Sequence, residues 1–341
     1  MKRPALVAHL PVASPLSGVG SLGSFVALAV LLALGLASVA LAQDAQEPAP
    51  PAKQGPEFEV VDLITGDGLS VQGFFFPSTE GENAVPVVLL HSLKGDGWKE
   101  YEGLAAYLQE QGCAVLVPNL RGHGQSTTFK ATGTVLDPAR ITNSEIGKMV
   151  QQYGDMEAWR SFLVQKNNER ALNLNKLCLV GSEMGASVAM HWALYDWRMF
   201  DLTARQRRPS VKALVLLSPQ KNFRGLDIRD PLASPAVRSL STMILVGRQD
   251  SKAYAQASQL DTALAKYHLG PPKGADKKEL AEWNETSKDL FFRSFDTSLQ
   301  GSKLLGVRQL MAPEIIGRFI ELRLGSARWN KEFPWRQIKK S

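Results

Sequence analysis

Cysteine and surplus charge are both scarce in this sequence. Two cysteines among 341 residues cannot build the framework of several disulfides that stabilises small secreted domains. The formal net charge is +6, and Lys2 and Arg3 near the N-terminus supply two of these charges, which leaves +4 for the remainder. That excess is too small and too scattered to indicate a nucleic-acid partner. Internal repeats are also missing, and nothing marks a second folded domain.

What the sequence does contain is typical of a globular protein. Hydrophobic residues make up 44% of the chain and charged residues 21%, which argues against disorder. The length suffices for one large α/β domain with a sizeable core. Cys113 and Cys178 each begin an apolar, strand-like run, so both are expected as buried apolar side chains.

The N-terminal 42 residues have the pattern of a targeting segment. A basic start without acids precedes an almost wholly apolar run at 25–42, which ends in Ala40-Leu41-Ala42. This small-x-small site predicts that residues 1–42 are a signal peptide and are removed. The alternative is an uncleaved N-terminal membrane anchor, because the apolar run is close to spanning length. No cysteine follows the run, which excludes a lipoprotein, and in either case the body is predicted to be exported to the periplasm or secreted.

The rest of the chain divides into a linker, a folded body and a tail. Residues 43–57 form a Pro-rich polar linker. Residues 58–325 alternate between strand and helix patterns. Residues 326–341 are a basic, aromatic tail, expected as a solvated or surface-packed end.

The alternation within the body predicts an α/β domain. Two runs with alternating polarity, 58–64 and 69–77, are separated by Thr65-Gly66-Asp67-Gly68 and predict a β-hairpin. Buried strands are then expected at 85–92, 113–120, 176–182, 213–219, 241–247 and 289–295. Helices are expected at 99–111, 154–165, 184–194, 251–267 and 313–324. This order predicts a mostly parallel twisted sheet of about eight strands with helices on both faces.

Three segments of the body carry motifs at the carboxyl ends of strands. The first contains His91-Ser92 and, one strand later, Arg121-Gly122-His123-Gly124-Gln125-Ser126. The second has a strand–turn–helix pattern around Gly181-Ser182-Glu183-Met184-Gly185, and the third contains Asp250 and then Gln300-Gly301 after the last strand. In this order after a hairpin, the segments resemble the α/β-hydrolase family over most of the chain.

The resemblance implies an α/β-hydrolase fold without a large lid. The segment 219–241 is short at the place where many family members carry a helical lid, while the longer insertion 127–152 is placed to cover part of the cleft. In the family's strand order the strand at 85–92 lies between those of Cys113 and Cys178. Their Cα atoms should then be about 10 Å apart, beyond disulfide reach.

The resemblance also implies where a catalytic triad would lie. The nucleophile position holds Glu183, the acid position Asp250 and the histidine position Gln300. The backbone amides of Leu93 and Met184 would form the oxyanion hole. Hydrolysis needs a nucleophile and a base that activates first the nucleophile and then water. An ester formed on Glu183 would still need activated water, and the amide of Gln300 cannot take a proton.

The remaining candidates do not restore the triad. Ser182 ends its strand one position before the turn, so its side chain should point away from the site. Histidine occurs five times, and none of the five follows the last strand; His268 lies before it, where a surface position is expected. Arg121 and His123 are expected to be structural.

The sequence therefore predicts an exported, catalytically degenerate homologue that binds a small molecule or a protein partner. Two alternatives stay open. One is an active esterase or peptidase with a displaced triad, and the other is a membrane-tethered scaffold protein that keeps its apolar segment. Nothing in the residues or the resemblance implies a metal or a cofactor, and contact with a membrane is expected only if residues 25–42 are not cleaved.

Overall fold

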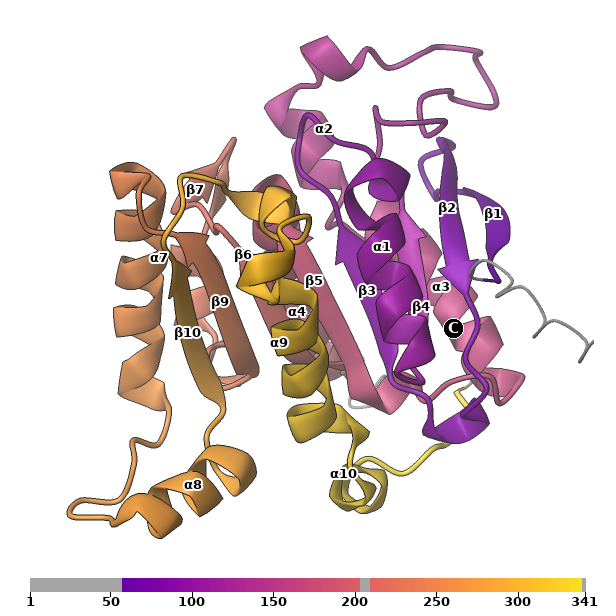
Figure 1. The fold of residues 1–341 in the computed structure, drawn as a ribbon. Coiled ribbons are helices and arrows are strands. Elements are labelled where there is room, and N and C mark those ends of the chain that lie inside the picture. Colours follow the sequence, from indigo (N-terminus) through magenta and orange to yellow (C-terminus); the bar gives the residue numbers. More distant parts are fainter. Residues whose placement is uncertain (1–56, 203–208, 339–341) are drawn as a thin grey trace, which may run out of the picture. The chain divides into compact units, whose positions relative to one another are not determined.

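The computed structural model describes residues 57–202 and 209–338, and an eight-stranded sheet runs through them (Figure 1). The strand order is β1-β2-β4-β3-β5-β6-β9-β10. Strand β2 is antiparallel to β1 and β4, and the other neighbours are parallel. The strands are β1 (Glu59–Ile64), β2 (Ser70–Phe76), β3 (Pro86–Leu90), β4 (Ala114–Pro118), β5 (Leu177–Ser182), β6 (Val211–Leu217), β9 (Ser241–Gly247) and β10 (Leu290–Phe295). The predicted mostly parallel, eight-stranded α/β fold is confirmed.

The predictions for the N-terminal segment concern residues that the structure does not describe, apart from residue 57. The expected signal segment 1–42 and all of the linker except residue 57 lie outside the described residues. Within the described ranges, no helix is both long enough and apolar enough to cross a membrane.

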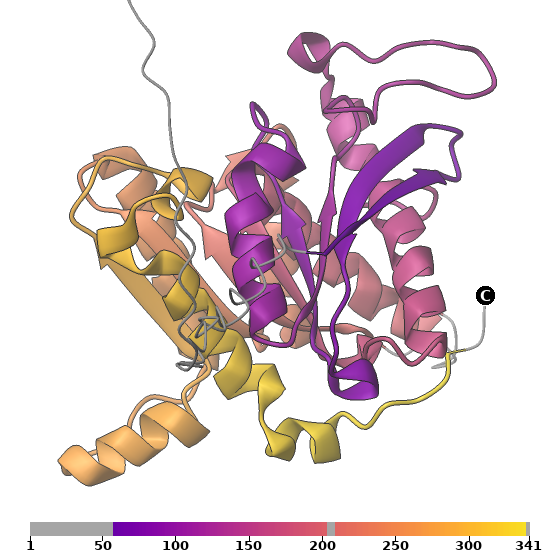
Figure 2. The same ribbon diagram turned by 45° about the vertical axis from the view of Figure 1, so that its right-hand side comes forward.

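Helices cover both faces of the sheet because buried strand side chains alternate between two cores. Val87 and Leu89 of β3 pack on the side of α1 and α9. Val88 and Leu90 pack on the side of α3, α4 and α7, and Figure 2 shows the two layers. The helices are α1 (Gly97–Glu110), α2 (Asn143–Lys148), α3 (Asp155–Asn168), α4 (Met184–Leu202), α5 (Arg229–Ala233), α6 (Pro235–Arg238), α7 (Ser251–Leu264), α8 (Lys277–Thr286), α9 (Ala312–Ile320) and α10 (Ala327–Glu332).

Several predicted helix boundaries were wrong. Helix α4 continues to Leu202 instead of ending at 194, and α7 ends at Leu264 and is followed by a 3-10 turn at Ala265–Tyr267. Helix α9 ends at Ile320, where a π-helical turn, Glu321–Gly325, continues the chain. In α7 and α9 the error concerns a last turn of another helical type, which periodicity does not distinguish. Helix α4 is longer than predicted by eight residues, 195–202.

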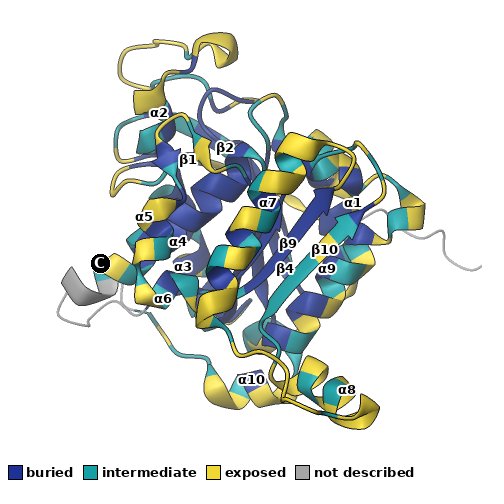
Figure 3. Cartoon of the chain, turned by 90° about the vertical axis from the view of Figure 1, so that its left-hand side faces the viewer, coloured by how far each residue is buried: buried dark blue, intermediate teal, exposed yellow. Residues whose placement is uncertain are grey.

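Some elements were not predicted at all. Helix α8 has no buried residue, and Figure 3 shows it in the colours of exposed and intermediate residues. A small hairpin of β7 (Asn222–Phe223) and β8 (Leu226–Asp227) follows β6. It precedes the short helices α5 and α6, so the segment before β9 is a small cap and not a large helical lid.

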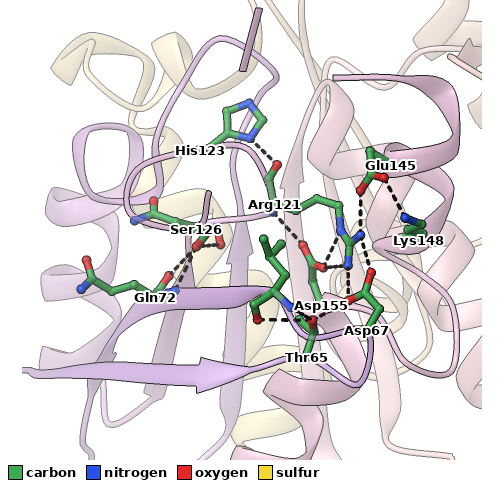
Figure 4. Close-up of polar contacts among 11 residues, drawn as sticks. Thr65, Asp67, Gln72, Arg121, His123, Ser126, Glu145, Lys148 and Asp155 are labelled. Atoms are coloured by element: carbon green, nitrogen blue, oxygen red, sulfur yellow. Dashed lines mark hydrogen bonds and ion pairs between the residues drawn. The ribbon is translucent and has the colours of Figure 1, made fainter. Parts of the chain in front are cut away.

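The insertion 127–152 projects from the end of the sheet at which the parallel strands finish (Figures 1 and 2). Its attachment depends on Arg121, whose side chain is fully buried (Figure 4). The guanidinium group contacts Asp155 at the start of α3, Asp67 in the first hairpin and Glu145 in α2. Arg121 therefore joins three segments distant in sequence, as its expected structural role requires.

The C-terminal tail is bound to the surface by asparagine side chains. After α10, the backbone oxygens of the tail accept hydrogen bonds from a row of side-chain amides, at 2.7–2.9 Å: Asn173 to Phe333, Asn175 to Pro334, Asn167 to Arg336 and Asn168 to Ile338. Because these bonds address the backbone, they fix the path of the tail with little demand on its sequence.

The two cysteines do not pair. Val87 of β3 pairs with Val115 of β4 on one side and with Cys178 of β5 on the other. Strand β3 therefore separates β5, which contains Cys178, from β4, which begins directly after Cys113. Both thiols are free and buried, which confirms the prediction.

Candidate functional site

The turn between β5 and α4 is a strained elbow centred on Glu183. Its φ of 49° lies in the left-handed region, which costs a residue with a Cβ about 1–2 kcal/mol. The Glu183 amide donates a hydrogen bond to the Leu217 carbonyl group at 2.9 Å. A Cβ atom at Gly181 would lie 2.3 Å from the backbone oxygen of Gly185, and one at Gly185 would lie 2.0 Å from that of Leu90. The two glycines are therefore required by sterics.

Two cavities meet at this elbow. The smaller, of about 460 Å³, is lined by Glu183, Asp250 and Gln300, among others. The larger, of about 730 Å³, also includes Glu183 and Gln300, and extends to Ser92 and Lys303. The structure thus brings to one cavity Glu183, Asp250 and Gln300, the three side chains that the resemblance suggested for the triad positions.

The Glu183 carboxyl group lies in an environment that disfavours its charge. Burial raises the pKa of Glu183 and the Glu100 carboxylate raises it further, while Lys303 and Lys94 act in the opposite direction. Among the described residues, no hydrogen-bond donor contacts this carboxyl group. Glu183 is therefore the uncommitted polar group where the two cavities meet.

Gln300, in contrast, is fully engaged. Its side-chain oxygen accepts hydrogen bonds from the Ser218 hydroxyl group at 2.6 Å and from the Gly247 amide at 3.3 Å. Its side-chain nitrogen donates to the Gly247 carbonyl group at 2.9 Å. The carboxamide group of Gln300 thus connects Ser218, directly after β6, with Gly247 at the end of β9. A carboxamide has no atom that acts as a base near neutral pH.

Asp250 lies in the same cavity but serves the helix that follows it. Its carboxylate accepts a hydrogen bond from the Ala253 amide at 3.0 Å, so it caps the N-terminus of α7. No imidazole accompanies it there: among the described residues, no histidine lines either cavity.

The described histidines are occupied elsewhere. His91 accepts a hydrogen bond from the Leu120 amide at 3.0 Å, and burial lowers its pKa to about 3. His123 approaches the backbone oxygen of Leu93 at 2.6 Å. The surface position expected for His268 was wrong, because its side chain is 3% exposed and lies 2.9 Å from the carboxylate of Asp289. His191 is also buried, in α4.

The backbone amides proposed for an oxyanion hole belong to Leu93 and Met184, which are sequence neighbours of the cavity-lining residues Ser92, Lys94 and Glu183. Among the described residues, neither the Leu93 amide nor the Met184 amide has a hydrogen-bond acceptor. The Ser92 amide differs, since it donates to the Glu100 carboxylate at 3.0 Å. Glu100 therefore occupies the Ser92 amide, whereas the Leu93 amide has no acceptor among the described residues.

Ser182 is withdrawn from the cavities. Its side chain is fully buried, and its hydroxyl oxygen accepts a hydrogen bond from the Ser302 amide at 2.9 Å. The Tyr101 hydroxyl group is its other hydrogen-bond neighbour. The Ser182 side chain therefore connects the end of β5 to the turn that contains Ser302, and it lines neither cavity.

Sequence reasoning missed Ser218, which lies at the end of β6. Its φ of 50° is also left-handed, and its hydroxyl oxygen accepts a hydrogen bond from the Gly301 amide at 2.9 Å while donating to Gln300. A Ser-Pro pair after an apolar run signals only the end of a strand, so nothing in the sequence marked this role.

The described part of the chain contains no group of three or more His, Cys, Asp or Glu side chains placed to hold a metal ion. The chemistry available at the elbow is that of carboxyl, ammonium, amide and backbone N–H groups. Such groups suit recognition of a polar ligand.

Comparisons with known proteins agree with this fold. The pattern of the alpha/beta hydrolase fold family matches residues 85–303, more than half of the chain. An esterase of Pyrococcus furiosus, Pf2001, superposes with a TM-score of 0.52 at 16% sequence identity, covering 79% of this chain and 92% of that one. An acylaminoacyl peptidase of Pyrococcus horikoshii gives 0.55 at 14% identity, covering 80% of this chain and 42% of that one. No curated protein matches the sequence.

At such low identity the two structures show the fold alone. The family pattern matches residues 85–303, a range that includes His91, the Glu183 elbow and Gln300. On this ground the chain belongs to the α/β-hydrolase family.

Proposed function

We propose that this chain is a catalytically degenerate α/β-hydrolase homologue that binds a small molecule or a protein partner at the Glu183 elbow. The observation that carries the proposal is the state of Gln300. The family's histidine would stand at this position, and here a carboxamide is bound on both of its polar atoms by Ser218 and Gly247. Among the described residues, no histidine lines these cavities to activate a nucleophile and then water, as the family's chemistry requires.

A carboxylate nucleophile does not rescue turnover. If Glu183 attacked a carbon centre, the resulting ester would need an activated water molecule to release it. Among the described residues, no histidine lines the cavities in which that water would stand. Loss of individual triad members costs several orders of magnitude in rate in enzymes of this chemistry.

An active enzyme with a displaced triad is the main rival. Ser187 and His191 share one face of α4, but Nδ1 of His191 lies 2.9 Å from the backbone oxygen of Ser187 and does not contact its hydroxyl group. Both side chains are buried, and neither lines either of the two cavities at the elbow. We therefore favour the degenerate homologue.

We also propose that the protein is exported, on the strength of its N-terminal sequence. Cleavage after Ala42 would release it, whereas retention of residues 25–42 would tether it and favour the scaffold alternative. Both forms place the same folded body outside the cytoplasmic membrane.

A hydrolysis screen tests the proposed function. The protein purified from cells that express the full chain is offered a broad panel of esters and peptides, beside Glu183→Ala. We expect the two proteins to show the same background. The double variant Glu183→Ser with Gln300→His is expected to gain ester hydrolysis. Hydrolysis by the wild-type protein that is lost in Ser182→Ala or Ser187→Ala, or in Glu183→Ala, overturns the proposal.

A further inference from the structure

Four lysines in the cleft at Glu183 form no salt bridge with any described residue. Lys94 and Lys303 line the larger cavity, and Lys221 and Lys252 line the smaller one. Within residues 57–202 and 209–338, none of these four ammonium groups forms a salt bridge or a side-chain hydrogen bond. Lys99, also in the larger cavity, differs because Asp96 lies 3.2 Å from its ammonium group.

The acids of the cleft are mostly engaged already. The Glu100 carboxylate accepts hydrogen bonds from the amide and the hydroxyl group of Ser92. Asp227 is paired with Arg229 at 2.8 Å, and Asp250 caps α7. Glu183 and the exposed Glu314 are left without donors in the described structure. Formal charges are close to balance, so it is the supply of unused hydrogen-bond donors that distinguishes this cleft.

These donors gather on the walls of the larger cavity around the elbow. Lys94 follows Leu93, whose amide is open, and Lys303 lies in the turn after Gln300. Glu183 precedes Met184, whose amide is open at the N-terminus of α4. An anionic group there would meet the ammonium groups of Lys94 and Lys303, which have no salt-bridge partner among the described residues. A cation would meet Glu183, Glu314 and Glu100, and the last of these already accepts hydrogen bonds from Ser92.

We propose that the larger cavity holds the carboxylate or phosphate group of a small organic anion, with Lys94 and Lys303 as its counter-charges and Glu183 beside it in protonated form. This inference rests on the proposed function, because it names the class of ligand for the same cleft. Binding then takes up a proton on Glu183, which changes from a repelling anion to a hydrogen-bond donor.

The environment of Glu183 supports this linkage. Its pKa is raised by burial and by Glu100, against Lys303 and Lys94. A bound anion raises the pKa of Glu183 further. By reciprocity, protonation of Glu183 increases the affinity of the cavity for the anion. Glu100, Lys303 and Lys94 act on Glu183 directly. The other charged groups that line the two cavities with it are Lys99, Glu314, Lys221, Lys252, Asp227 and Asp250.

Direct titration with acetate and with inorganic phosphate tests the proposal. Binding is followed by calorimetry at constant ionic strength, with ethylammonium as the cationic comparison. We expect saturable binding of the two anions, without saturable binding of ethylammonium. Acetate should bind more tightly at about pH 6 than at about pH 8, where Glu183 loses its proton more readily. Saturable binding of ethylammonium, or no binding of either anion, overturns the proposal.

Matched variants locate the site. Lys94→Gln and Lys303→Gln should each weaken acetate binding about fivefold, which corresponds to about 1 kcal/mol. Lys99→Gln removes the same charge from the same cavity, but its ammonium group is already paired, so we expect less than about a twofold change. Glu183→Gln should bind acetate equally well at both pH values. Equal losses in all three lysine variants, or an intact pH dependence in Glu183→Gln, would show that the anion binds elsewhere.

The outcome is separable from that of the hydrolysis screen. A protein that hydrolyses esters contradicts the proposed function, whatever it binds. A protein that is inert and binds ethylammonium or neither probe keeps the proposed function and loses the anion site.

Discussion

The Ser218 hydroxyl group donates a hydrogen bond to the side-chain oxygen of Gln300 at 2.6 Å. The same hydroxyl oxygen accepts one from the Gly301 amide at 2.9 Å. Ser218 therefore ties the end of β6 to the loop after β10, and its hydrogen bond fixes the side chain of Gln300. The geometry explains why a carboxamide is stable there, and it also makes Ser218 a target for substitution.

Replacement of Ser218 by alanine should destabilise the fold by about 1–3 kcal/mol, because the buried Gly301 amide loses its acceptor and Gln300 loses one of its donors. Urea unfolding of the variant beside the wild-type protein measures the difference. Ser251→Ala is the control, since Ser251 is exposed at the start of α7 and should change stability by less than about 0.5 kcal/mol. Equal effects of the two substitutions would show that the hydrogen bonds of Ser218 with Gln300 and Gly301 do not contribute to the stability of the fold.

Replacement of Arg121 by methionine should be far more costly. Arg121 and Asp155 are both completely buried, with a nitrogen–oxygen distance of 2.8 Å, and removal of one partner leaves a buried charge uncompensated at a cost of about 3–5 kcal/mol. Limited proteolysis should then cleave first in the insertion 127–152, which loses its Arg121–Glu145 contact.

Arg140→Met provides the matched control. Arg140 forms an exposed pair with Asp137, and its loss should cost less than about 1 kcal/mol. If the two arginine variants unfold at the same urea concentration, the buried network in Figure 4 has no special role in stability.

The elbow was accessible to prediction because its requirements are local. Gly181 and Gly185 must lack side chains to allow the turn and the close approach of α4 to β3, so their spacing fixes the register of Glu183. Chain order then places Asp250 and Gln300 after later strands of the same sheet, and the structure shows all three side chains around one cavity.

Other features depend on partners that are distant in sequence. The left-handed conformation of Ser218 follows from its contacts with the loop after β10, and the burial of His268 follows from Asp289. Helix α8 packs no apolar face, and its one sequence signal was the capping pair Asp276 and Glu279. Periodicity cannot report such contacts, because it records only which face of an element is apolar.

Thiol titration should find two free cysteines in denatured, unreduced protein and almost none in native protein. Burial raises the pKa of Cys113 to about 12 and raises that of Cys178 even more. The reactive thiolate is therefore rare, and access to it is blocked. An absence of thiols after denaturation would mean that the two cysteines pair after all.

N-terminal sequencing of the exported protein should find Gln43 as the first residue. The expectation rests on Ala40-Leu41-Ala42 after the apolar run. Recovery of Met1 from the membrane fraction would instead support an uncleaved anchor. Ala42→Leu should block processing without altering the folded body, which begins beyond the linker.

Glu183→Gln should remove a pH dependence of stability. Because the folded-state pKa of Glu183 is raised above its ordinary value of 4.5, the folded protein holds this proton more tightly than the unfolded chain does. Stability must then fall as pH rises from about 4.5, and it levels off above the raised pKa. The free energy of unfolding of Glu183→Gln, relative to the wild-type protein, should accordingly increase across this window.

Urea unfolding at a series of pH values provides the measurement. Glu314→Gln is the control, because it removes an exposed carboxylate from the wall of the same cavity, and its stability curve should run parallel to that of the wild-type protein. If the curve of Glu183→Gln is also parallel to that of the wild-type protein, the fold does not raise the pKa of Glu183. The proton uptake that we propose for anion binding would then have no source in the fold.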